Sequence, residues 1–300
     1  MIYQRERFPL AVHIPLIGAF SFSAIAYSRL CRGVTGFIPV ADYAACMLTN
    51  LVLFFLLRVS DEHKDRADDA QYRPYLPVPR GLVTLGELRH VALVLFAVVT
   101  CVNMICYPRL LLLYGIMMGY LLLMRYEFFM PQALRQRQLL YNISHMAIIP
   151  LADMYASGYD WQLGHATPPA GLLFFLGVSY LNGFVLETGR KIRTAEKEET
   201  GVISYTRLWG RKGAPLIWIA LLAANFTLAC IAARYAGHTQ ATYYVLTALF
   251  AGCIIPAALF IVKPSEKAYK GIELMSLLWA LGMYLVLGGI PLAAALWTQS

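Results

Sequence analysis

Residues 58–74, RVSDEHKDRADDAQYRP, gather acidic side chains at the end of an apolar segment. If they continue a helix, Asp61, Asp65 and Asp69 fall at i, i+4 and i+8 and lie on nearly one face. Like charges at that spacing destabilise a helix. A hard divalent cation would relieve the repulsion, and Mg²⁺ typically takes one or two carboxylates together with substrate phosphates. The spacing therefore indicates a candidate magnesium site, with Asp61, Asp65 and Asp69 as ligands.

Basic side chains surround these acids. Lys64 lies inside the stretch, and Arg73 and Arg80 follow on the proline-stiffened segment YRPYLPVPRG. Arginines beside metal-binding carboxylates suit a diphosphate, because cations bind its oxygens while the metal stabilises the leaving group. The alternative is a solvated loop in which the acids pair with the neighbouring cations. Two further acids are candidate ligands or supporting groups: Glu62 and Asp68.

The elements that position these residues are membrane helices. The chain of 300 residues is 59% hydrophobic and 14% charged, whereas soluble domains carry about 25% charged residues. Nine apolar runs approach or reach the length that spans a bilayer, roughly 17–25 residues. They cover residues 10–28, 37–57, 90–107, 109–124, 139–157, 169–187, 214–233, 241–262 and 272–297. We predict one all-α polytopic membrane domain over residues 1–300, a bundle of nine transmembrane helices.

The basic residues predict the orientation, because loops rich in Lys and Arg stay in the cytoplasm. With a cytoplasmic N-terminus, 21 of the 25 Lys and Arg residues fall on the cytoplasmic side. That side holds the N-terminus and the loops 58–89, 125–138, 188–213 and 263–271. The cations are spread over separate loops, so we expect no nucleic-acid partner. The six cysteines include no CxxC pair, so neither a zinc site nor a disulfide framework is predicted.

The stretch DEHKDRADD followed by RPYLPVPRGLVTLGEL resembles the first aspartate-rich motif of the UbiA superfamily of intramembrane prenyltransferases and its RP…P…G sequel. Nine spans, with acidic motifs in the loops after the second and sixth (58–89 and 188–213), match that family's plan over nearly the whole chain. The resemblance implies a prenyl diphosphate substrate, Mg²⁺ as cofactor, and a site that opens toward the cytoplasm. It implies catalytic roles for Asp61 and Asp65.

The family pattern is Asn-x-x-x-Asp-x-x-x-Asp, and two registers fit it. If Asp61 and Asp65 are its aspartates, the asparagine position holds Leu57; if Asp65 and Asp69 are, it holds Asp61. The spacing to the RP sequel favours the first register. Asp61 and Asp65 belong to the motif in either register.

The family's second motif is a pair of aspartates, but this chain has NGFVLETGRKIRTAEKEETG instead. The resemblance implies Glu187 as the ligand of a second metal and Arg190 and Lys191 as phosphate-binding groups. Asn182 lies about one and a half turns earlier and could add a side-chain oxygen. The alternative ligands are Glu196, Glu198 and Glu199, for which a solvated acidic loop is the favoured explanation.

A polar face is predicted within the apolar run 139–157. The sequence YNISHMAIIPLADMY places Tyr141, Asn142, His145 and Asp153 in it. Such a face lines a cavity or forms a hydrogen-bond network between helices. Ring faces stabilise cations, so several aromatic residues are candidates for lining a pocket: Phe54, Phe55, Tyr120, Tyr126, Tyr141, Phe174, Phe175 and Tyr180.

These features predict an enzyme that ionises an allylic prenyl diphosphate such as farnesyl or geranylgeranyl diphosphate. The carbocation then either cyclises to a terpene, which the diverged motifs favour, or passes to an aromatic or lipid acceptor. A third class, an ion-coupled transporter, predicts charges near the middle of the membrane. Here most charges lie at the ends of spans.

Overall fold

The computed structural model describes residues 2–198 and 204–297, and the secondary structure in these ranges is helical. The chain divides into two compact units. The first comprises residues 1–22 and 38–166, and the second comprises residues 23–37 and 167–300. Helix α2 (Leu10–Cys31) contributes to both units.

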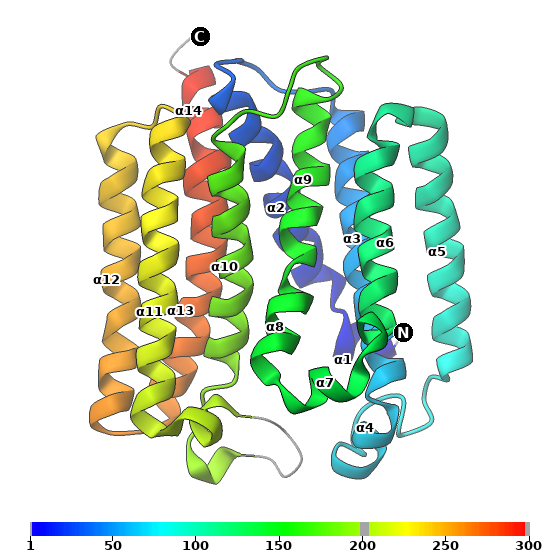
Figure 1. The fold of residues 1–300 in the computed structure, drawn as a ribbon, viewed down its shortest axis with the longest axis vertical. Coiled ribbons are helices and arrows are strands. Elements are labelled where there is room, and N and C mark those ends of the chain that lie inside the picture. The colour runs from blue at the N-terminus through cyan, green and yellow to red at the C-terminus, as the bar shows by residue number, and fades with distance from the viewer. Residues whose placement is uncertain (1, 199–203, 298–300) are drawn as a thin grey trace. The chain divides into compact units, whose positions relative to one another are not determined.

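The first unit is built on α3, which contacts α5, α6 and α9, while α6 also packs against α9 (Figure 1). The short helices α4 and α7 and the turn η2 lie at one end of this unit. Besides the start of α2, its elements are α1 (Ile2–Arg7), α3 (Val40–Lys64), α4 (Arg66–Tyr72), α5 (Leu85–Cys106), η1 (Pro108–Leu110), α6 (Leu111–Arg125), η2 (Glu127–Phe129), α7 (Pro131–Gln136), α8 (Gln138–Met146) and α9 (Ile148–Trp161).

In the second unit α10 packs against α11 and α13, and α12 packs against the same two helices. Its elements are the end of α2, α10 (Leu172–Arg190), η3 (Ala195–Lys197), α11 (Tyr205–Tyr235), α12 (Gln240–Val262), α13 (Glu266–Tyr284), the π-helical turn η4 (Leu285–Gly289) and α14 (Ile290–Trp297). Gly189 lets α10 approach α13 closely, because a Cβ there would overlap the Ser276 hydroxyl. The Trp218 indole donates to the same hydroxyl at 3.1 Å.

Eight helices are long and apolar enough to cross a membrane among the residues described, against nine predicted. The difference lies in the run 139–157, which forms α8 and α9 with a break at Ala147. Pro150 explains the break, because a proline ring clashes with the carbonyl four residues earlier, here that of Met146, the last residue of α8.

The connection that carries the acidic stretch is shorter than the predicted loop 58–89, because α3 extends to Lys64 and α5 begins at Leu85. A capping box starts α5. The Thr84 hydroxyl accepts from the Glu87 amide at 3.1 Å, and the Thr84 amide donates to the Glu87 carboxylate at 2.8 Å. This pairing satisfies two amide groups that a helix start leaves without partners.

We expect Gly189→Ala to destabilise the protein by about 1–3 kcal/mol, because the added methyl group overpacks the contact between α10 and α13. Thermal unfolding of the purified protein in detergent measures this. Gly115→Ala is the control, because no atom lies within 4 Å of the added Cβ. Equal unfolding temperatures for the two variants would contradict the close packing.

Candidate functional site

The acidic stretch stays helical across the junction of α3 and α4. The amides of Asp65, Asp69 and Arg73 each donate to the carbonyl four residues earlier, at 2.8, 2.7 and 2.9 Å. Asp61, Asp65 and Asp69 therefore follow one another at helical turns, as their spacing predicts. The Asp61 side chain is 43% exposed, Asp65 is half-buried, and Asp69 is buried.

The three carboxylates differ in their counter-charges. Asp61 pairs with Lys64 at 3.5 Å, and Asp69 pairs with Arg73 at 3.2 Å. Asp65 has no ion-pair partner within 4 Å among the described residues. Burial and then the charge of Asp61 raise the pKa of the Asp65 carboxyl, while Lys64 and Arg73 oppose them. Asp65 is therefore the carboxylate whose charge is compensated least.

A divalent cation fits this pair of acids. In the parts of the chain that the structure describes, no group of three or more metal-ligating side chains converges. Mg²⁺ does not require such a group, since one or two carboxylates, water and substrate phosphates complete its coordination. Asp61 and Asp65, one turn apart, supply hard oxygen ligands, and a cation beside them would oppose the burial and the Asp61 charge that raise the pKa of the Asp65 carboxyl.

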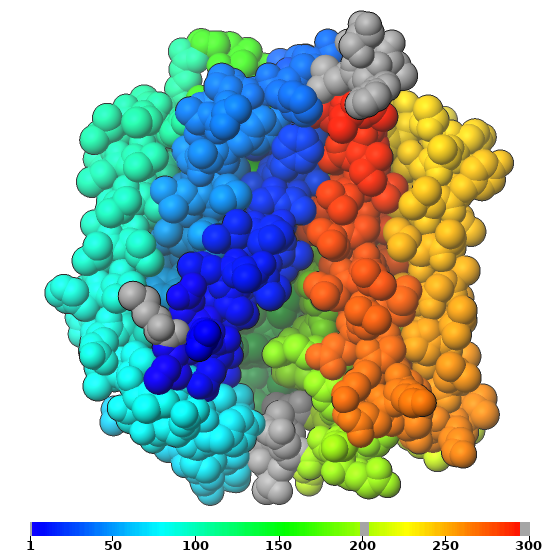
Figure 2. All heavy atoms as spheres, turned by 180° about the vertical axis from the view of Figure 1, so that it is seen from behind, coloured from blue at the N-terminus to red at the C-terminus, as the bar shows by residue number. Residues whose placement is uncertain are grey.

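Glu62 and Arg80 contact the N-terminal helix α1. The Glu62 side chain is 1% exposed and accepts from Arg7 at 2.7 Å and from Arg58 at 3.3 Å. Arg80 pairs with Glu6 at 3.1 Å. Figure 2 shows the dark-blue start of the chain lying against the cyan segment that carries the motif. Glu62 therefore anchors α1 through Arg7. Asp68, the other supporting candidate, is exposed on α4.

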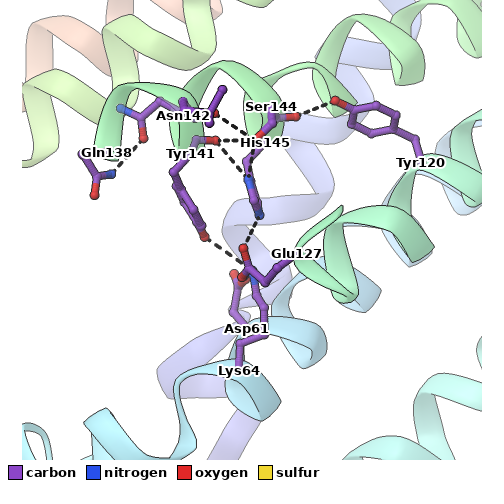
Figure 3. Close-up of polar contacts among 10 residues, drawn as sticks. Asp61, Lys64, Tyr120, Glu127, Gln138, Tyr141, Asn142, Ser144 and His145 are labelled. Atoms are coloured by element: carbon purple, nitrogen blue, oxygen red, sulfur yellow. Dashed lines mark hydrogen bonds and ion pairs between the residues drawn. The ribbon is translucent and has the colours of Figure 1, made fainter. Parts of the chain in front are cut away.

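Lys64 connects the motif to a second group of polar residues in the same unit (Figure 3). Its ammonium lies 3.1 Å from the Glu127 carboxylate and 3.4 Å from the Tyr141 hydroxyl. The other Glu127 oxygen lies 3.8 Å from Nε2 of His145. The His145 ring stacks on the Tyr141 ring with centroids 3.8 Å apart.

Glu127 was not predicted from the sequence. It lies in the segment 125–138, where Glu127, Phe128 and Phe129 have φ angles of 50°, 50° and 59°. Three consecutive residues other than glycine in the left-handed region are strained, at about 1–3 kcal/mol each. The turn directs Glu127 onto Lys64. The only signal in the sequence is an acid inside a segment rich in aromatic and basic residues.

The remaining polar residues of the 139–157 run lie inside the first unit. Asn142 is buried and accepts from the Gln138 amide at 3.0 Å. Asp153 is fully buried on α9. Tyr120 donates its hydroxyl to the Ser144 carbonyl at 2.6 Å, at the end of α8. Tyr141 and His145 thus join the Lys64 group, while the structure shows Asn142 bonded within α8.

The second unit holds its own cluster at the end of α10. Glu187 pairs with Arg190 at 2.7 Å and with Lys191 at 2.5 Å, so one carboxylate faces two cations. Lys191 also lies over the Tyr205 ring, 5.8 Å from its centroid. The Asn182 amide is buried and lies 2.7 Å from the Asn225 amide.

Of the alternative acids in this unit, Glu198 accepts from the Ser204 hydroxyl at 2.6 Å. Glu196 and Glu198 line a cavity of about 400 Å³ together with Arg193, Arg207 and Arg211. Glu199 lies outside the described residues. The structure therefore leaves Glu187, with its two cations, as the better-defined candidate at the end of α10.

Eight long apolar helices within the described ranges, with acids and cations paired at helix ends, define a polytopic α-helical membrane protein. The model of the UbiA prenyltransferase family matches residues 20–271, so the chain belongs to that family. Among the curated proteins no sequence matches the chain.

Two solved structures share the fold. A UbiA homologue from Aeropyrum pernix K1, solved without ligand, is 15% identical, with a TM-score of 0.66 over 94% of this chain and 98% of that chain. A digeranylgeranylglyceryl phosphate synthase, described in membranes, is 14% identical, with a TM-score of 0.62 over 97% and 100%.

We expect Glu62→Gln to lower the free energy of unfolding by about 1–3 kcal/mol, because Arg7 and Arg58 lose a buried counter-charge. Thermal unfolding and hydrogen exchange of α1 measure this. The control is Glu266→Gln, an exposed acid paired with Lys270, for which little change is expected. Unchanged stability of Glu62→Gln with a lost response to Mg²⁺ would instead make Glu62 a metal ligand.

Proposed function

We propose that the chain is a Mg²⁺-dependent membrane enzyme that ionises an allylic prenyl diphosphate, such as farnesyl or geranylgeranyl diphosphate, and releases diphosphate. The observation that carries the proposal is the environment of Asp65. This residue is a half-buried acid one turn from two other acids, without an ion-pair partner among the residues described. A cation bound there offsets the repulsion, and the family description supports prenyl chemistry.

In this proposal Asp61 and Asp65 hold the metal and Asp69 supports them. When bound, Mg²⁺ neutralises the charge that develops on the departing diphosphate. Lys64 and Arg73 already lie beside the acids and donate to phosphate oxygens. Arg80 joins them only by leaving its exposed pair with Glu6.

In the second unit, the cluster of Glu187, Arg190 and Lys191 has more cations than acids, whereas the acids of the first motif lie close together. Glu187 is a proposed ligand of a second ion, while Arg190 and Lys191 are proposed to bind phosphate oxygens. Two cations against one carboxylate leave a positive excess, which suits an anion. Asn182 is a supporting group whose amide is held by Asn225.

We favour cyclisation for the fate of the carbocation. The DEHKD and ETGRK sequences depart from the motifs that the prenyltransferase resemblance implies, most of all by the loss of the second aspartate pair. The competing outcome, transfer of the prenyl group to an aromatic or lipid acceptor, is supported by the family description. The distribution of Lys and Arg supports a site that opens toward the cytoplasm.

Incubation of the purified protein with farnesyl diphosphate and Mg²⁺, without an acceptor, is expected to yield a cyclic hydrocarbon and diphosphate. Gas chromatography with mass spectrometry identifies the product, and geranylgeranyl diphosphate is the second substrate to try. Chelation of the metal should stop the release of diphosphate. Turnover that appears only when an aromatic or lipid acceptor is added would identify a transferase.

Asp65→Ala is expected to reduce diphosphate release by at least about 10²-fold, because the charge that the metal requires is removed. The fold should persist, since Asp65 makes no ion pair among the described residues, and thermal unfolding in detergent checks this. Glu266→Ala, at an exposed acid of the second unit, is the matched control and should keep its activity. Wild-type turnover by Asp65→Ala would overturn the metal-site assignment.

A further inference from the structure

His145 is buried, and its imidazole faces the partly buried carboxylate of Glu127. Nε2 of His145 and Oε2 of Glu127 lie 3.8 Å apart, and neither atom has a hydrogen-bond partner in the described part of the chain. His145 is 6% exposed. Buried polar atoms in proteins usually have a hydrogen-bond partner, and these two unsatisfied atoms are an acid and a base that face each other.

The tautomer of His145 follows from its other nitrogen. Nδ1 lies 3.0 Å from the Tyr141 carbonyl oxygen, which only accepts hydrogen bonds. We therefore assign the proton of the neutral ring to Nδ1, which leaves the lone pair on Nε2. A lone pair and a carboxylate oxygen then face each other. A proton placed between them would be bound by both groups.

The surroundings hold this arrangement in place. Lys64 pairs with the other oxygen of Glu127 at 3.1 Å, and the strained left-handed turn fixes the position of Glu127. The His145 ring stacks on Tyr141 and meets the edge of Phe128 at 5.8 Å. Strain of this kind persists only where the surroundings over-determine it, and it clusters at functional sites.

The pair is also connected to the proposed metal site. Asp61 contacts Lys64, Lys64 contacts Glu127, and Glu127 faces His145 (Figure 3). His145 therefore lies three contacts from the first acid of the motif. Aromatic rings flank it, and ring faces stabilise cations.

We propose that His145 is the proton acceptor that completes the reaction and that Glu127 is its positioning residue. This inference rests on the proposed function, and either fate of the carbocation releases one proton. In cyclisation, Nε2 takes the proton from a carbon next to the cationic carbon, and the C–H electron pair becomes the new double bond. In transfer to an aromatic ring, the same atom takes the ring proton and the electron pair restores aromaticity.

The charges balance in both cases. Diphosphate leaves with the electrons of the C–O bond, the carbocation loses a proton, and neutral imidazole becomes imidazolium. The Glu127 carboxylate faces that imidazolium and stabilises it. Proton transfer to water after the product leaves restores the neutral ring.

The test measures two products separately on the purified full-length protein, with a prenyl diphosphate that the wild type turns over. Diphosphate release reports ionisation, and the hydrocarbon or prenylated product reports proton loss. For His145→Gln we expect diphosphate release within about threefold of wild type and a proton-loss product reduced by about 10²-fold. Prenyl alcohol, formed when water captures the cation, should rise in its place.

Two further variants separate a chemical role from a structural one. Glu127→Gln should shift the products in the same direction, and added imidazole should restore the proton-loss product in His145→Ala. His90→Gln, an exposed histidine on α5, is the control. The proposal would be overturned if the His145 variants lost diphosphate release and proton-loss product equally and imidazole restored neither. An unchanged ratio of prenyl alcohol to proton-loss product would also overturn it. Absence of diphosphate release by the wild type would instead refute the proposed function.

Discussion

Repulsion between acids in an apolar protein is the constraint on which the described site depends. A charge removed from water is costly unless a counter-charge lies beside it. Glu62 is therefore held by Arg7 and Arg58, Asp69 by Arg73, and Glu127 by Lys64. These pairs fix α1, the junction of α3 and α4, and the turn η2 around one end of the first unit. Asp65 stands apart because the protein supplies no ion pair for it within the described residues.

Both units carry acidic and basic side chains at the end of a long helix, but in different ratios. In each, a long helix ends in an acid followed within one turn by a cation: Asp61 and Lys64 at the end of α3, and Glu187 and Arg190 at the end of α10. The first unit adds further acids, whereas the second adds another cation at Lys191. By charge alone, the first cluster favours a metal ion and the second favours an anion.

The sequence predicted the features that depend on local spacing. Apolar runs gave the helices, and the i, i+4 spacing of Asp61, Asp65 and Asp69 gave their helical order, because both follow from the period of one helix. Contacts between distant segments were not predictable in this way. Arg7 of α1, which pairs with Glu62, lies 55 residues earlier in the sequence. Glu127 contacts Lys64 because three consecutive residues of its turn adopt the left-handed conformation. Residues with a side chain disfavour that conformation, and no sequence pattern indicates it. The run 139–157 forms two helices and not one, because Pro150 acts on a carbonyl one turn earlier.

That proline has an effect beyond the shape of the backbone. By ending α8 at Met146, it places His145 in the last turn of a helix. The carbonyl groups of a last turn carry a partial negative charge, which favours a cation nearby by about 0.3–1 kcal/mol. In an unbroken span the same imidazole would sit in mid-helix, where this field is absent. A residue that makes no contact with the proton would in this way offset part of the cost of charging a buried imidazole.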